Sequence, residues 1–180
     1  MWLTEMSCTS GLMSKKAIII QGSSRSKGNT ALVVNKVLSH CHAEKLDLNC
    51  LQIHPYDYEY RHMDDDFIPA VEKILKYDIL VFATPVYWYS MSGIMKNFFD
   101  RITDLLKKRK DLGYQLRGKS MMVIRCGSEE ALLPEFIAPF VYSAEYLDMK
   151  FGGHLHTWIE NGEIPEGLKE EIECFAGNLQ

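Results

Sequence analysis

The sequence lacks the features that would mark a membrane, secreted or nucleic-acid-binding protein. No apolar run approaches the roughly 20 residues that a membrane-spanning helix needs, and residues 1–15 have no basic start followed by an apolar block, as a secretory signal has. The net charge is −4 and the isoelectric point lies near 5.9, which argues against general nucleic-acid binding. We therefore expect a cytoplasmic protein that binds neither membranes nor nucleic acid.

Cysteine patterns typical of metal sites are also missing. The cysteines are odd in number and include no CxxC pair, and no Cys/His spacing suited to a metal ion stands out. We expect scattered reduced thiols in a cytosolic protein and no metal centre. The five cysteines are Cys8, Cys41, Cys50, Cys126 and Cys174.

The chain instead shows an alternation of buried-strand and helix patterns. The isoleucine-rich segment 16–21 suits a strand buried on both faces, and the apolar spacing over 30–41 suits a helix. With 180 residues, of which 47% are hydrophobic, the chain fits one domain at 16–180 after an N-terminal extension at 1–15. Further strands are predicted over 45–52, 78–84, 120–127 and 154–160, and further helices after Asp64, Asp65 and Asp66, over 93–108, over 131–148 and from about residue 165.

Alternating elements of this length predict parallel strands joined by crossover helices. The expected fold class is α/β: a doubly wound, five-stranded parallel sheet in the order 2-1-3-4-5, with helices on both faces in three αβα layers. In such sheets ligands bind beyond the carboxyl ends of the strands, where the strand order reverses. Here the reversal falls between the first and third strands, as in flavodoxin-like folds, which bind flavin mononucleotide (FMN) at that point.

The loop after the first strand, "GSSRSKGNT" at 22–30, is rich in glycine and hydroxyl groups and opens a helix. It is neither a Walker A sequence, since five residues separate Gly22 from Gly28 and no Lys-Ser/Thr pair follows, nor GxGxxG. A terminal phosphomonoester fits better than a triphosphate, because the start of a helix attracts anions; the alternative is a plain turn with a good N-cap. Arg25 and Lys27 would be solvated or would steer an anionic cofactor. The candidate donors are Ser23, Ser24, Ser26, Asn29 and Thr30.

The loop after the third strand, "TPVYWYSMSG" at 84–93, groups Tyr87, Trp88 and Tyr89 just before a helix that Ser90 or Ser92 can cap. A planar heteroaromatic ring needs apolar and aromatic walls with a few backbone hydrogen bonds. The alternative is that these aromatics pack against neighbouring loops or a second subunit. A phosphate site and an aromatic wall on adjacent strands together favour a mononucleotide with a flat ring, and FMN fits better than a dinucleotide.

On these motifs the chain resembles the flavodoxin-like NAD(P)H-dependent FMN reductases, and among them the branch that includes the iron–sulfur flavoproteins. The family often shows Gly-Ser-Pro-Arg and Gly-Asn-Thr in the first loop. In the second it often shows Pro-Val-Tyr-Trp, a small residue, Ser and a Lys-x-Phe-x-Asp-Arg helix, and "PVYWYSMSGIMKNFFDR" matches this here except at Tyr89. The resemblance spans roughly residues 16–160. It implies FMN phosphate contacts from Ser23, Ser24, Arg25, Ser26, Asn29 and Thr30, and ring contacts from Pro85, Val86, Tyr87, Trp88 and Ser90, with Cys126 and Gly127 closing the far side of the ring.

Two departures from the family pattern stand out. Residues 51–67 contain no cysteine, and Cys50 alone cannot hold an iron–sulfur cluster. Tyr89 stands where a small residue is common, and we expect its ring to narrow the approach of substrates. The tyrosine-rich segment 53–64 would cover the flavin, meet a second subunit, or only pack onto its own domain.

The function implied is that of an FMN-dependent oxidoreductase that takes hydride from NAD(P)H and reduces a quinone, a flavin, a nitro- or azo-aromatic or a protein. The flavin carries the redox chemistry, so no catalytic side chain is identified. One alternative is a flavodoxin-type electron carrier that serves a protein partner without NAD(P)H turnover; the modest charge of −4 speaks against it. Another is a binding protein that has lost the cofactor. By analogy with the family, we expect small-molecule redox substrates and a homodimer or homotetramer.

Overall fold

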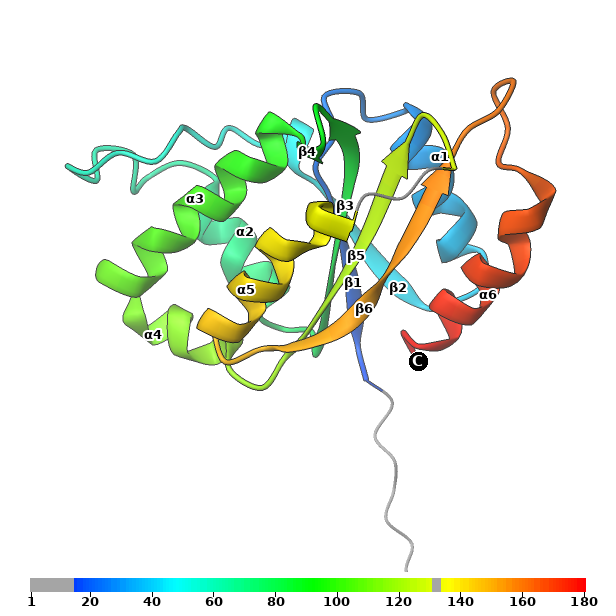
Figure 1. Ribbon diagram of the computed structural model, residues 1–180. Coiled ribbons are helices and arrows are strands. Elements are labelled where there is room, and N and C mark those ends of the chain that lie inside the picture. Colours follow the sequence, from blue (N-terminus) through cyan, green and yellow to red (C-terminus); the bar gives the residue numbers. More distant parts are fainter. Residues whose placement is uncertain (1–14, 131–133) are drawn as a thin grey trace, which may run out of the picture.

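The structure, a computed structural model, describes residues 15–130 and 134–180 and places a parallel sheet between two layers of helices (Figure 1). Within these residues five parallel strands follow the path β2-β1-β3-β5-β6, and β4 (Ser90–Met91) adds a short antiparallel partner to β3. Counted along the chain without β4, this is the predicted order 2-1-3-4-5, so the predicted fold class is confirmed. The parallel strands are β1 (Ala17–Gln21), β2 (Ala43–Asp47), β3 (Ile79–Tyr87), β5 (Ser120–Gly127) and β6 (Lys150–Trp158).

Helices cover both faces of the sheet. Those numbered α2, α3 and α5 pack on one face and α1 and α6 on the other, with the short α4 following α3 (Figure 1). In β1, Ile18 and Ile20 join the core on the first face and Ile19 the core on the second, so one isoleucine run serves both layers. No helix in the described ranges combines the length and apolar character needed to cross a bilayer. The helices are α1 (Asn29–Leu38), α2 (Phe67–Ile74), α3 (Gly93–Lys107), α4 (Lys110–Gly113), α5 (Ala138–Tyr146) and α6 (Lys169–Gly177).

Two predicted strand boundaries need correction. The second strand ends at Asp47 rather than 52, because the Asp47 carboxylate accepts a hydrogen bond from the N–H of Asn49, 3.0 Å away, and starts a 3-10 turn over Leu48–Cys50. The last strand begins at Lys150 rather than 154. Its first half contains Gly152 and Gly153 and a shift in register against β5. The sequence there consequently lacks the residue pattern that predicts a strand.

Parts of two predictions fall outside the described residues. The predicted extension at 1–15 does so except for Lys15, and the predicted helix at 131–148 does so for residues 131–133. After that gap a 3-10 turn covers Pro134–Ile137 and leads into α5. Pro134 opens the turn and Pro139 lies in the first turn of α5, where proline is tolerated.

A buried arginine ties α3 to the tyrosine-rich segment 53–64. Arg101 is 1% exposed, and its Nε donates to the Asp104 carboxylate at 2.6 Å. Its two terminal nitrogens donate to both oxygens of Asp65 and, at 2.9 Å each, to the backbone carbonyls of His54 and His62. All five N–H groups of the guanidinium are therefore used. Because His54 and His62 meet on one side chain, the segment between them leaves and returns at a single fixed point.

The acidic residues before α2 hydrogen-bond to Arg101 and to backbone N–H groups of the tyrosine-rich segment and of α2. Burial would raise the pKa of Asp65, but the hydrogen bonds from Arg101 and from backbone N–H groups outweigh it and hold that pKa below its ordinary value. Asp65 accepts from the N–H of Phe67 at 3.0 Å, as a capping residue would. Asp66, at the N-cap itself, accepts instead from the N–H of Gln52 at 2.8 Å, so its side chain does not cap α2.

Replacing Arg101 with methionine, which keeps much of the volume, should lower the free energy of unfolding by about 3–5 kcal/mol, because two carboxylates and two carbonyls lose their buried partner. Urea unfolding followed by circular dichroism measures it. The matched control is Arg109→Met, since Arg109 pairs with Asp111 at the surface and should matter by about 1 kcal/mol or less. Equal losses in the two variants would contradict the assignment.

Candidate functional site

Three loops lie together at the carboxyl-terminal edge of the sheet. Figure 1 shows the β1–α1 loop, the β3–β4 hairpin and the segment after β5 (residues 128–130) at this same edge. Strands β1 and β3 are neighbours, with Gln21 paired to Ala83, while the chain continues from them to β2 on one side and β5 on the other. This is the point at which strand order reverses, where open α/β sheets bind their ligands.

The first of these loops leaves the start of α1 open. Gly28 occupies the N-cap of α1, and a glycine has no side chain to accept hydrogen bonds from the N–H groups of the first turn. The N–H of Gly28 itself donates to the carbonyl of Arg25 at 3.1 Å, which bends the loop toward the helix. An anion is therefore the natural acceptor for the remaining first-turn N–H groups, and the helix dipole favours its charge.

The predicted phosphate-binding side chains gather around that helix start. Ser23 and Thr30 are buried, Ser26 is half-buried, and Ser24, Arg25 and Asn29 are exposed. Ser26 is held from two sides, because its hydroxyl accepts from the Asn49 amide at 3.1 Å and its carbonyl from the Gln21 amide at 3.3 Å. Asn49 lies in the 3-10 turn after β2, and this support was not predicted from the sequence. Lys27 is exposed.

The start of α3, by contrast, is filled by the protein's own groups. The Ser92 hydroxyl accepts from the N–H of Met95 at 3.1 Å and donates to the carbonyl of Gly22 at 2.6 Å. The Ser92 N–H donates to the Thr84 hydroxyl at 3.0 Å. Ser92 thus caps α3, which is one of the two predicted caps, and also fastens the loop after β3 to the loop after β1.

Gly22 brings α3 directly against the β1–α1 loop. A β-carbon built at Gly22 would lie 2.8 Å from the Cε and 2.9 Å from the Cβ of Met95. The N–H of Gly22 also extends the sheet by donating to the carbonyl of Ala83 at 2.8 Å. A larger residue would push the helix and the loop apart, so the spacing between the two halves of the site depends on this glycine.

The segment predicted as a loop at 84–93 is a β-hairpin. Strand β3 runs on to Tyr87, beyond its predicted end at 84, and pairs Val86 with Met91 and Tyr87 with Ser90. The two turn residues, Trp88 and Tyr89, have φ of 48° and 63°. Such left-handed turns normally carry Asn-Gly, so the sequence showed no hairpin signal here.

A cavity of about 250 Å³ lies between this hairpin, the segment after β5 and β6. Of the predicted ring contacts, Val86, Trp88 and Gly127 line it. Its aromatic rim and its backbone from the segment after β5 suit a flat heteroaromatic ring. The lining residues are Val86, Trp88, Tyr89, Arg125, Gly127, Ser128, Glu129, Phe136 and His156.

The other predicted ring contacts lie beside the cavity. Pro85 sits within β3, paired with Cys126 of β5, while Tyr87 and Ser90 are exposed on the hairpin. Cys126 is 4% exposed, and its side chain belongs to the core on the α1 and α6 face, where burial raises the pKa of the thiol. Any contact of Cys126 with a ligand would come from its backbone.

The basic wall of the cavity was not predicted. Arg125 is 2% exposed, and its guanidinium carbon lies 5.5 Å from the centre of the Phe136 ring. Next to it on β6, the Nε2 of His156 lies 3.2 Å from the carbonyl oxygen of Glu129. Burial lowers the pKa of Arg125 and of His156, and the charge of Arg125 lowers the latter further. A signal existed in the sequence, since an arginine interrupts the apolar strand "MMVIRCG".

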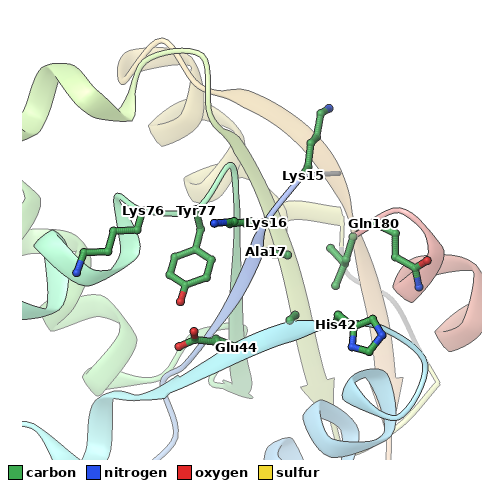
Figure 2. Close-up of a pocket in the computed structure, with 10 residues that line it drawn as sticks. Lys15, Lys16, Ala17, His42, Glu44, Lys76, Tyr77 and Gln180 are labelled. Atoms are coloured by element: carbon green, nitrogen blue, oxygen red, sulfur yellow. The ribbon is translucent and has the colours of Figure 1, made fainter. Parts of the chain in front are cut away.

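A second cavity, of about 720 Å³, lies at the opposite edge of the sheet (Figure 2). It is bordered by the amino ends of β1 and β2 and contains none of the predicted site residues. In it the hydroxyl of Tyr77 points toward the carboxylate of Glu44, an interaction that raises the pKa of Tyr77 to about 12. Among the described residues no group of three or more His, Cys, Asp or Glu side chains could hold a metal ion.

Known proteins match this chain along most of its length. The family model of the NADPH-dependent FMN reductases matches residues 15–133. YwqN of Bacillus subtilis (strain 168), named as an NAD(P)H-dependent FMN-containing oxidoreductase, is 32% identical over 172 residues, which cover 89% of this chain and 93% of YwqN.

Solved structures agree with the fold. The Trp repressor binding protein from Bacillus subtilis is 28% identical and superposes with a TM-score of 0.69, covering 91% of this chain and 97% of the other. General stress protein 14 from Treponema denticola, solved in complex with FMN, is 17% identical with a TM-score of 0.62, covering 91% and 95%. The second likeness concerns the fold alone.

Replacing Ser92 with alanine should lower the free energy of unfolding by about 1–2 kcal/mol, because α3 loses its cap and Gly22 its donor. Ser90→Ala is the control, since Ser90 is exposed on the same hairpin and its loss should cost no more than about 0.5 kcal/mol. Both values come from urea unfolding of the protein without ligand. If Ser92→Ala were as stable as Ser90→Ala, the hydrogen bonds of the Ser92 hydroxyl to Gly22 and Met95 would not stabilise the fold as expected.

Proposed function

Because the chain belongs to the NADPH-dependent FMN reductase family, with FMN as cofactor and NAD(P)H as co-substrate, we propose that it passes the electrons on to a quinone or another flat aromatic acceptor. The observation that carries this proposal is the pairing of an open helix start on α1 with an aromatic-rimmed cavity at the same edge of the sheet. The first suits a phosphate and the second a planar ring.

In this proposal the phosphate of FMN lies at the start of α1. The first-turn N–H groups of the helix would donate to it, and the hydroxyls of Ser23, Ser26 and Thr30 would surround it. Arg25, exposed beside them, adds positive charge and so raises the rate at which an anionic cofactor arrives. Ser24 and Asn29 are further donors in the same loop.

The ring of FMN would enter the cavity between the hairpin and the segment after β5. Val86 and Trp88 provide apolar contact, and the backbone near Gly127 provides hydrogen bonds. When bound, FMN accepts a hydride from NAD(P)H and delivers two electrons to the acceptor. Arg125 keeps a positive charge at the cavity wall, which stabilises negative charge that develops beside it. The surrounding side chains exclude water and make that charge more effective.

The acceptor is proposed to be flat because the mouth of the cavity, beyond the space that the FMN ring would fill, is aromatic. The accessible edge is lined by Trp88 and Tyr89, whose rings favour stacked partners. Quinones, free flavins and nitro- or azo-aromatics share this shape, and quinones are the compact members of the group.

Adding NADPH without oxygen to the purified, FMN-loaded protein should rapidly bleach the visible absorbance of the flavin, because NADPH would transfer a hydride to the ring. Readmitting a quinone should restore the absorbance. A flavodoxin-type carrier would keep its colour until a protein partner was added, so the absence of bleaching with both NADPH and NADH would reject the enzymatic reading. Protein that stayed colourless in excess FMN would reject both.

A carboxylate placed at the start of α1 should repel the phosphate. We expect Thr30→Glu to raise the Kd for FMN about tenfold or more, equivalent to about 1.4 kcal/mol or more, measured by quenching of FMN fluorescence. Thr30 is buried, so Asn29→Glu at the exposed neighbouring position is the second variant. Asn35→Glu is the control, because it adds the same charge on an exposed position farther along the same helix. Unchanged affinity in both Thr30→Glu and Asn29→Glu would mean that the phosphate binds elsewhere.

A further inference from the structure

The turn of the β3–β4 hairpin holds two large aromatic residues in an unfavourable backbone conformation. Trp88 and Tyr89 are adjacent and both have positive φ, at 48° and 63°. In this region the β-carbon of an L-residue meets the following carbonyl oxygen, so glycine and asparagine are preferred and bulky residues are rare. The pair is therefore strained at the position where Asn-Gly would be relaxed.

Packing within the chain does not offset this strain. Trp88 is 93% exposed and Tyr89 is 70% exposed, so neither ring gains much from burial. The hairpin itself is well anchored, since Met91 is 7% exposed and the neighbouring Ser92 makes the hydrogen bonds to Thr84 and Gly22 described above. A strained but firmly held pair at a cavity mouth points to a role in binding rather than in folding.

Both rings border the cavity of the candidate site. Trp88 and Tyr89 line it together with Val86, and Phe136 and His156 lie among the residues of the other walls. The turn therefore fixes two aromatic faces at the entrance of the cavity, where in the proposed function an electron acceptor would approach. Fixed rings lose little conformational freedom when they bind a partner, which makes them effective stacking surfaces.

We propose that Tyr89 is a specificity-determining residue, and that with Trp88 it forms a narrow slot that admits planar, fused-ring acceptors by stacking and turns away bulky, non-planar ones. The inference rests on the proposed function and names the substrate class of that same site. It also explains the strain in the turn, because the left-handed backbone conformation places the Tyr89 ring at the mouth of the cavity.

The test compares wild type with Tyr89→Gly, Tyr89→Asn and Tyr89→Phe in two measurements. The first is the ratio of kcat/KM for a planar probe, a naphthoquinone, to that for a non-planar probe, hexacyanoferrate(III). We expect Tyr89→Gly and Tyr89→Asn to lower this ratio about tenfold, the size of one lost aromatic stacking contact, and Tyr89→Phe to keep it within about twofold. The second is urea unfolding without ligand, in which Tyr89→Gly should raise the folding equilibrium constant about fivefold, because the strain is relieved.

Tyr60→Gly is the matched control. Tyr60 is also a left-handed tyrosine, with φ of 58°, but it lies under Lys108 at the far end of α3, 4.5 Å from that ammonium group. The residues from Ser92 to Lys108 span about 24 Å of helix, so this tyrosine is far from the cavity. Its replacement should leave the ratio of the two probes unchanged.

Three outcomes would overturn the inference. The ratio could stay constant in Tyr89→Gly while NADPH still bleaches the flavin, which would leave the proposed function intact. Tyr89→Gly could be less stable than wild type, which would mean that its ring serves the fold. The substitution could dissociate an oligomer without changing the ratio, which would make Tyr89 an interface residue. Failure of NADPH to bleach the wild-type flavin is a different result, and it would remove the proposed function itself.

Discussion

The candidate site depends on one hydroxyl group. The hydroxyl of Ser92 donates to the carbonyl of Gly22 and accepts from the N–H of Met95, so it joins the loop after β1 to the start of α3. The phosphate-type loop and the aromatic hairpin belong to different crossover units, and sheet pairing alone would leave their tips free to separate. With this bond, and with Gly22 packed on Met95, the two halves keep one spacing.

The two helix starts at this edge differ, and the difference decides what each can bind. At α3 the capping serine satisfies the backbone, and nothing further is needed. At α1 the N-cap residue is Gly28, which has no side chain to accept hydrogen bonds from the N–H groups of the first turn. The open start of α1 therefore suits an anion, and the cavity beside the hairpin suits a flat ring. In the proposed function, the buried charge of Arg125 would lie beside the ring and would stabilise the negative charge that develops on it during reduction.

The sequence was sufficient for the strand order and for much of the phosphate loop, because buried runs such as 16–21 and the glycine spacing at 22–30 are local patterns. It was less informative where structure depends on distant partners. The hairpin at 86–91 went unseen because its turn carries Trp88 and Tyr89 in place of the usual Asn-Gly. The cavity wall from Arg125 and His156 arises only when β5 and β6 pair, and the support of Ser26 by Asn49 only when β2 lies beside β1.

Arg101 has a consequence for how this protein can change over evolution. The segment from His54 to His62 begins and ends on one guanidinium, so its two ends are fixed whatever lies between them. The entropic cost of closing a loop rises only slowly with loop length. An insertion in this segment would therefore leave the sheet undisturbed. The segment between His54 and His62 can therefore accept substitutions of its tyrosines, or insertions as large as a binding module, without altering the fold that carries the site.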